Sequence, residues 1–166
     1  MTVESQNRES QTREPQTREP QTWRSRSEAE TEAVGARLAE ALSPDGTMLL
    51  RGDLGSGKTV LVRGMAVPLG IDRQEIQSPT YTLVHEHHGT GGRLVHVDLY
   101  RLEPETEDPE AWTSLGLDEL LTGPGIKAIE WPERLGSPPR GAVWVTLRTL
   151  EDGEREIVCT AGGPPV

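Results

Sequence analysis

Phenylalanine is absent from the 166 residues, only 33% of them are hydrophobic, and there is a single cysteine, Cys159. A chain of this length suits one domain with an aliphatic core, and a lone cysteine excludes an internal disulfide. No apolar run is long enough for a secretion signal or a membrane span. We therefore expect one cytoplasmic domain without membrane contact.

Basic residues are also scarce, since 17 Lys and Arg stand against 27 Asp and Glu for a net charge of −10. Five Arg and four Glu give residues 1–26 a charge of +1, which leaves −11 for the other 140 residues. An acidic surface repels phosphate backbones, so a large nucleic-acid interface is disfavoured. We expect any RNA to be held by a partner.

The first 26 residues differ from the rest in composition as well as charge. Residues 11–20 contain the sequence QTREP twice, with almost nothing apolar to bury. Such polar repeats cannot form a packed core. The composition predicts a disordered low-complexity tail over residues 1–26 and a folded domain over residues 27–166.

Residues 52–59, GDLGSGKT, form a complete G-x-x-x-x-G-K-T loop directly after the apolar residues 48–50. Glycines let backbone N–H groups turn inward around phosphate oxygens. We expect Lys58 to meet the outer phosphates and Thr59 to reach Mg²⁺, while the next helix points its positive end at the same anion. The loop predicts a nucleoside triphosphate site, whose binding residues would be Gly55, Ser56, Gly57, Lys58, Thr59 and Val60.

The hydrophobic pattern predicts an α/β fold, a single P-loop NTPase-like domain whose mixed sheet has antiparallel hairpin additions and flanking helices. Ser27 with Glu30 fits a capping box at the start of a first helix. Turn residues at 89–92 and 151–154 predict two hairpins. In order, we expect helices within 27–42, 59–67 and 109–121, and strands over 47–51, 81–87, 94–100, 126–131, 142–150 and 155–161.

Two of the predicted strands end in an acid, Asp98 and Glu130. Each would place a carboxylate at the C-terminal edge of the sheet, where open α/β sheets bind ligands. Hydrolysis needs a second magnesium contact and a group that orients water. Spacing alone does not decide which acid has which role.

The phosphate loop and four later motifs resemble the bacterial TsaE family, also called YjeE. The later motifs are SPTYTLV (78–84), HVDLYRL (96–102), GLDE (116–119) and IEWPER (129–134). The resemblance covers residues 27–153, and the N-terminal tail matches nothing in the family's pattern. It implies that Glu130 joins Thr59 around Mg²⁺ and that Asp98 positions water. It further implies that Thr80 senses the terminal phosphate and that Glu28 and Gly153 approach the nucleoside end of ATP.

This resemblance implies an ATP-hydrolysing subunit for threonylcarbamoyladenosine modification of tRNA beside the anticodon, in tRNAs that read codons beginning with A. The reaction, ATP to ADP and phosphate, would be slow alone and stimulated by the partners TsaD and TsaB, with tRNA met only indirectly. Two alternatives stay open: a small-molecule kinase that uses the same loop, and a nucleotide-gated binding module without catalysis. A GTPase is disfavoured because no Asn-Lys-x-Asp or Thr-Lys-x-Asp motif follows the loop.

Overall fold

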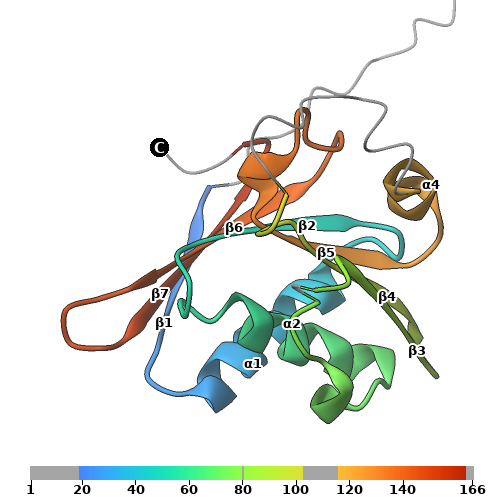
Figure 1. The fold of residues 1–166 in the computed structure, drawn as a ribbon. Helices are drawn as coiled ribbons and strands as arrows, with labels where there is room; N and C mark the ends of the chain where they lie inside the picture. Colours follow the sequence, from blue (N-terminus) through green and yellow to red (C-terminus); the bar gives the residue numbers. More distant parts are fainter. Residues whose placement is uncertain (1–18, 80, 103–115, 164–166) are drawn as a thin grey trace, which may run out of the picture.

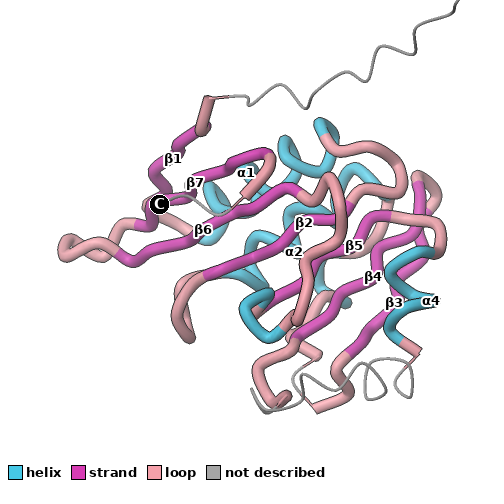
Figure 2. Tube along the Cα trace, turned by 90° about the horizontal axis from the view of Figure 1, so that it is seen from above, coloured by secondary structure: helices cyan, strands magenta, loops and turns pink. Residues whose placement is uncertain are grey.

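A seven-stranded mixed sheet forms the centre of the computed structural model, which describes residues 19–79, 81–102 and 116–163. The strands are β1 (Gln21–Ser25), β2 (Thr47–Arg51), β3 (Val84–Gly89), β4 (Gly92–Asp98), β5 (Ile126–Glu130), β6 (Val143–Thr149) and β7 (Arg155–Ala161). They lie in the order β1-β7-β6-β2-β5-β4-β3 (Figure 2). β2 is parallel to β5 and β6, and β4 is parallel to β5, whereas the other neighbours are antiparallel. The predicted α/β fold with hairpin additions is confirmed.

The parallel strands β2, β4 and β5 end at the same edge of the sheet. β5 is buried throughout, and β2 is buried up to its last residue, as expected for central parallel strands covered on both faces. In the register of these strands, Glu130 pairs with both Leu50 and Asp98. The loop that follows β2 therefore lies beside the two acids that the sequence singled out.

Helices cover both faces of this sheet. They are α1 (Glu28–Ala41), α2 (Lys58–Ala66) and α4 (Leu117–Thr122), with short 3-10 turns η1 (Val67–Leu69), η2 (Arg73–Glu75) and η3 (Pro132–Arg134). α1 and α2 pack on one face, and α4 lies over the other (Figure 1). The buried clusters on the two faces consist of Leu, Ile, Val, Met and Ala. The domain therefore has the aliphatic core that its composition predicted.

The capping signal predicted for the first helix is present at α1. The Ser27 hydroxyl accepts the N–H of Glu30 at 3.1 Å, and the Glu30 carboxylate accepts the N–H of Arg26 at 2.7 Å. Both interactions satisfy donors at the entry to the helix. They fix where α1 begins, which also fixes the position of Glu28 in its first turn.

The disordered tail predicted over residues 1–26 is too long, because residues 21–25 form β1. β1 pairs antiparallel with β7 along its whole length. Trp23 packs against the main core, and the buried Ser25 hydroxyl lies 2.7 Å from that of Thr31. An edge strand held by backbone hydrogen bonds needs few apolar side chains, so composition did not reveal it. Residues 1–18 lie outside the described residues.

Several other predicted boundaries differ from the structure; β4, for example, covers Gly92–Asp98 instead of residues 94–100. β3 begins at Val84 instead of Tyr81, because Leu83 has a φ of +63°, a left-handed conformation that interrupts an extended strand. The predicted helix over 109–121 corresponds to α4 in its last part, and residues 109–115 lie outside the described residues. Within the described ranges, no helix has the length and hydropathy that a membrane span requires.

Candidate nucleotide-binding site

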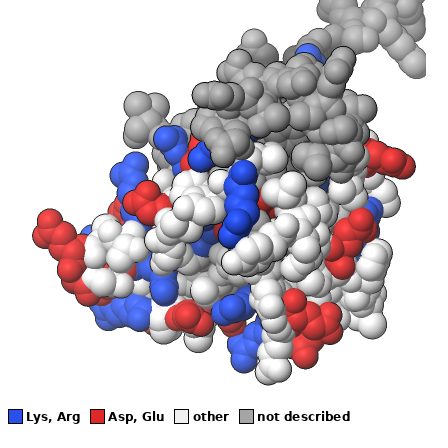
Figure 3. Space-filling view, in the orientation of Figure 1, with Lys and Arg blue, Asp and Glu red and all other residues white. Residues whose placement is uncertain are grey.

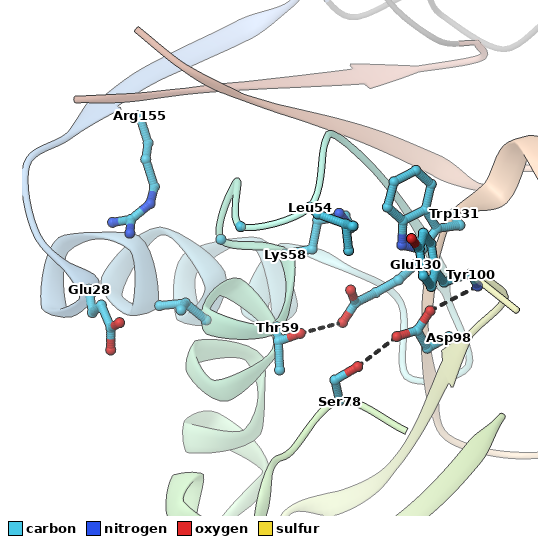
Figure 4. Close-up of a pocket in the computed structure, with 13 residues that line it drawn as sticks. Glu28, Leu54, Lys58, Thr59, Ser78, Asp98, Tyr100, Glu130, Trp131 and Arg155 are labelled. Atoms are coloured by element: carbon cyan, nitrogen blue, oxygen red, sulfur yellow. Dashed lines mark hydrogen bonds between the residues drawn. The ribbon is translucent and has the colours of Figure 1, made fainter. Parts of the chain in front are cut away.

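A cavity of about 380 Å³ opens where β2, β4 and β5 end (Figure 4). The phosphate loop, the first turn of α1, the ends of β4 and β5 and the start of β7 all contribute to its wall. We call one side the carboxylate end, formed by Thr59, Ser78, Asp98 and Glu130, and the opposite side the outer end, formed by Glu28 and Arg155 (Figure 4). The phosphate loop lies between the two ends.

The phosphate loop has the backbone shape that its glycines predicted. Gly55 and Gly57 have φ values of +77° and +103°, which side chains disfavour. A Cβ atom at position 57 would also stand 3.0 Å from Nε of Arg155. Ser56 is buried, and its Oγ atom has no hydrogen-bond partner among the described residues. A buried hydroxyl left unpaired costs stability unless a ligand satisfies it, so the loop fits a bound anion.

Lys58, the first residue of α2, is held by the loop that it follows. Its Nζ donates to the carbonyl oxygens of Gly52 at 2.6 Å and Asp53 at 2.9 Å, and lies 4.3 Å from the centre of a Trp131 ring. Burial lowers the pKa of Lys58, and the Glu130 carboxylate opposes that shift. An ammonium has three hydrogens, so two fixed bonds leave one for a ligand in the cavity.

The carboxylate end is built around Glu130. Oε1 of Glu130 accepts the Thr59 hydroxyl at 2.8 Å and also lies 2.8 Å from Nε2 of His96. The Glu130 side chain is almost fully buried. A hydroxyl and a carboxylate are hard oxygen ligands of the kind that Mg²⁺ prefers, in combination with nucleotide phosphates. The residues at this end therefore fit a magnesium ion.

Asp98 lies next to Glu130 on the neighbouring strand, in direct register with it. Its Oδ2 accepts the Ser78 hydroxyl at 2.6 Å, and its Oδ1 accepts the backbone N–H of Tyr100 at 3.0 Å (Figure 4). These bonds orient the carboxylate toward the cavity that it lines. Ser78 lies two residues before Thr80, so its hydrogen bond links Asp98 to the chain just before Thr80.

Most of the residues predicted for the site share this cavity. Thr80 lies outside the described residues, and Gly153 is absent from the described residues that line the cavity. Arg155, two positions further along the hairpin, lines it instead. Ser56 is buried and is not among the described residues that line the cavity, whereas the other predicted residues do line it, namely Glu28, Gly55, Gly57, Lys58, Thr59, Val60, Asp98 and Glu130.

Sequence reasoning missed three polar residues at the site, namely Ser78, His96 and Arg155. Ser78 and His96 each lie inside a family motif, but nothing in their spacing gave them a role. Arg155 begins the last strand, and its contact with the phosphate loop at Gly57 joins residues far apart in sequence.

Comparisons with known proteins support one family. The family model for "Threonylcarbamoyl adenosine biosynthesis protein TsaE" matches residues 25–157. A tRNA threonylcarbamoyladenosine biosynthesis protein TsaE from Bacillus subtilis is 37% identical over 142 residues, which cover 85% of each chain. One from Treponema pallidum is 40% identical over 134 residues, covering 80% of this chain and 95% of its own. The crystal structure of Bacillus subtilis YdiB superposes with a TM-score of 0.70 at 29% identity, covering 90% of each chain.

Proposed function

The chain belongs to the TsaE family, and on this premise we propose that it is an ATPase that serves threonylcarbamoyladenosine modification of tRNA. The contact between the Thr59 hydroxyl and the Glu130 carboxylate carries the proposal. It brings together two oxygen-bearing side chains of the kind that Mg²⁺ prefers, at the start of the helix that follows the glycine-rich loop, and this supports a magnesium-nucleotide site. A glycine-rich turn that binds no nucleotide would not require a buried carboxylate beside it, and burial of a carboxylate is costly.

The two ends of the cavity suggest how ATP is oriented. The loop from Gly55 to Thr59 would hold the phosphates, with Thr59 and Glu130 holding Mg²⁺ at the carboxylate end. The nucleoside would then extend toward Glu28 and Arg155 at the outer end (Figure 4). When bound, Mg²⁺ would neutralise charge on the phosphate oxygens during transfer.

We assign the positioning of water to Asp98. Its carboxylate is held by Ser78 and Tyr100 in an orientation that leaves it on the cavity wall. Catalysis of phosphoryl transfer depends mainly on the position of the attacking group. Because Ser78 leads into the segment that contains Thr80, a change in that segment would alter the position of Asp98. We propose that hydrolysis by the isolated chain is slow, and that a partner which contacts Ser78 stimulates it by fixing the position of Asp98.

The mouth of the cavity suits such a partner. Leu54 lines the cavity and is 66% exposed. Tyr81 lies three residues after Ser78, which also lines the cavity, and is 85% exposed. Large apolar side chains exposed next to a binding site are typical of surfaces that another protein covers. We propose that TsaD and TsaB are the partners that bind here.

Contact with tRNA would be indirect. The net charge is −10, and on the face drawn in Figure 3 the basic side chains are interspersed with acidic ones and form no continuous basic surface over the described residues. Nucleic-acid binding depends on clustered positive charge. The modified tRNAs would be those that read codons beginning with A, and the chain would act in the cytoplasm.

The proposal is tested by ATP hydrolysis of the purified full-length chain, alone and with TsaD and TsaB. Wild-type activity is expected to be low alone and to rise steeply with both partners. Asp98→Ala should abolish that rise, whereas Glu40→Ala, which removes an exposed acid on α1, should preserve it. Equal rates with and without partners would contradict partner stimulation, and a screen of acceptor hydroxyls for phosphorylated product would then test a kinase.

A further inference from the structure

His96 lies directly behind the carboxylate end of the cavity. It is two residues before Asp98 on β4, so both side chains project from the same face of the sheet, and it is completely buried. Its Nε2 atom lies 2.8 Å from Oε1 of Glu130. The same oxygen accepts the Thr59 hydroxyl. Glu130 is therefore held from both sides, by α2 and by β4.

The direction of the hydrogen bonds follows from the chemistry of the groups. An ionised carboxylate only accepts hydrogen bonds, so Nε2 of His96 carries a hydrogen and donates it. Nδ1 of His96 is buried and has no hydrogen-bond partner among the described residues. A buried ring nitrogen without a partner is unfavourable. Among the described residues, the contact with Glu130 is therefore the only hydrogen bond of this imidazole.

We propose that His96 is a positioning residue that holds the Glu130 carboxylate in place for magnesium; the proposal rests on the assignment of Glu130 as a magnesium ligand. A threonine hydroxyl that donates its hydrogen to Glu130 keeps its lone pairs for the metal. Thr59 would therefore contact both Glu130 and the ion, whereas His96 would contact Glu130 but not the ion. Groups that orient a ligating carboxylate typically change metal affinity by about 10- to 100-fold when they are removed.

The experiment measures ADP affinity of the full-length chain by calorimetry, in Mg²⁺ and in EDTA. His96→Leu removes the donor and keeps an apolar side chain of moderate size. It should reduce the gain in affinity that Mg²⁺ gives by about 10-fold or more and leave the affinity in EDTA unchanged. His96→Gln retains an N–H donor and should recover most of that gain.

His87 provides the matched control. It is half-buried on the adjacent strand β3, projects from the same face, and its Nε2 is likewise unpaired among the described residues. Its hydrogen bonds do not include Glu130, so His87→Leu should keep the full effect of Mg²⁺. Wild-type magnesium dependence in His96→Leu would overturn the proposal, and so would an equal loss in His96→Leu and His96→Gln.

A second measurement needs no His96 variant and covers the case in which His96→Leu does not fold. Long-range ¹H–¹⁵N spectra of the wild-type chain should show Nε2 of His96 protonated and hydrogen-bonded, both without ligand and after addition of Mg²⁺ and ADP. Loss of that bond in the loaded state would overturn the positioning role. The proposed function fails separately, if ADP affinity of the wild-type chain itself does not respond to Mg²⁺.

Discussion

The chain contains two lysines, and they lie at opposite edges of the sheet. Lys58 follows the end of β2, and Lys127 is near the start of β5. Both side chains are buried, and burial lowers the pKa of both. Each ammonium donates to two backbone carbonyls, those of Gly52 and Asp53 for Lys58 and those of Asp45 and Gly123 for Lys127.

The difference between the two lysines lies in what surrounds them. Lys127 links the turn before β2 to the C-terminal cap of α4, so its bonds connect parts of the protein to each other. Lys58 lines an open cavity beside Glu130 and Asp98. We therefore propose that the same arrangement serves structure at one edge of the sheet and anion binding at the other. Substitutions should separate the two roles.

The largest effect on binding is expected for Lys58→Ala. A charge-assisted hydrogen bond to phosphate contributes about 1.5–3 kcal/mol, so loss of the one hydrogen that Lys58 has free should weaken ATP affinity by about 100-fold at the upper end of that range. The unfolding temperature should change little, because water in the open cavity can replace Nζ at the two carbonyls. Calorimetry and thermal unfolding measure the two quantities. Unchanged ATP affinity would contradict the assignment of Lys58.

Glu130→Ala should act on the magnesium-dependent part of binding. The change removes a metal ligand and leaves the phosphate loop intact, so affinity in Mg²⁺ should fall by about 10- to 100-fold while affinity in EDTA stays close to wild type. Glu133→Ala removes an exposed acid three residues away and serves as the control. Equal losses in Mg²⁺ and in EDTA would show that Glu130 does not hold the metal.

Lys127→Met should lower stability and leave ATP affinity unchanged, which is the opposite of the result expected for Lys58→Ala. It removes the donor from the half-buried hydrogen bonds to the carbonyls of Asp45 and Gly123, which should lower the free energy of unfolding by about 2 kcal/mol. For a domain of this size the unfolding temperature should then fall by about 4–8 °C. ATP affinity measured below that temperature should match wild type. A chain as stable as wild type would contradict the structural role of Lys127.

The smallest effect is expected at the outer end of the cavity. Arg155→Ala should weaken ATP binding by about 10-fold, the low end of the value of one hydrogen bond to a charged group, without altering the response to Mg²⁺. Arg148, exposed on β6 and outside the cavity wall, provides the control Arg148→Ala. If the two variants bind ATP equally well, Arg155 does not contact the nucleotide.

Features that depend on neighbours in sequence were predicted well. The phosphate loop, the capping box at Ser27, the hairpin turns and the buried strand before Glu130 each have a local signature of residue type and spacing. Because parallel strands end at one edge, even the meeting of Asp98 and Glu130 followed from the two strand ends. These features include most of the candidate site.

Features that depend on strand order and twist were not predicted. β1 was missed because an edge strand is held by its backbone, and only Trp23 gave it apolar contact. The contact of His96 with Glu130 runs diagonally between strands, so it requires knowledge that β4 and β5 are neighbours. That Arg155, and not Gly153, lines the cavity likewise depends on how the β6–β7 hairpin lies beside the phosphate loop. A single sequence carries no local signal for such relations.

The central claim, that Lys58 belongs to a magnesium-dependent ATP site, is tested most directly by one set of titrations. A non-hydrolysable ATP analogue is titrated into the wild-type, Lys58→Ala and Lys127→Met chains, each with and without Mg²⁺. We predict equal affinity and an equal gain from Mg²⁺ for wild type and Lys127→Met, and a loss of up to about 100-fold for Lys58→Ala. Wild-type affinity in Lys58→Ala, or an equal loss in both variants, would contradict the claim.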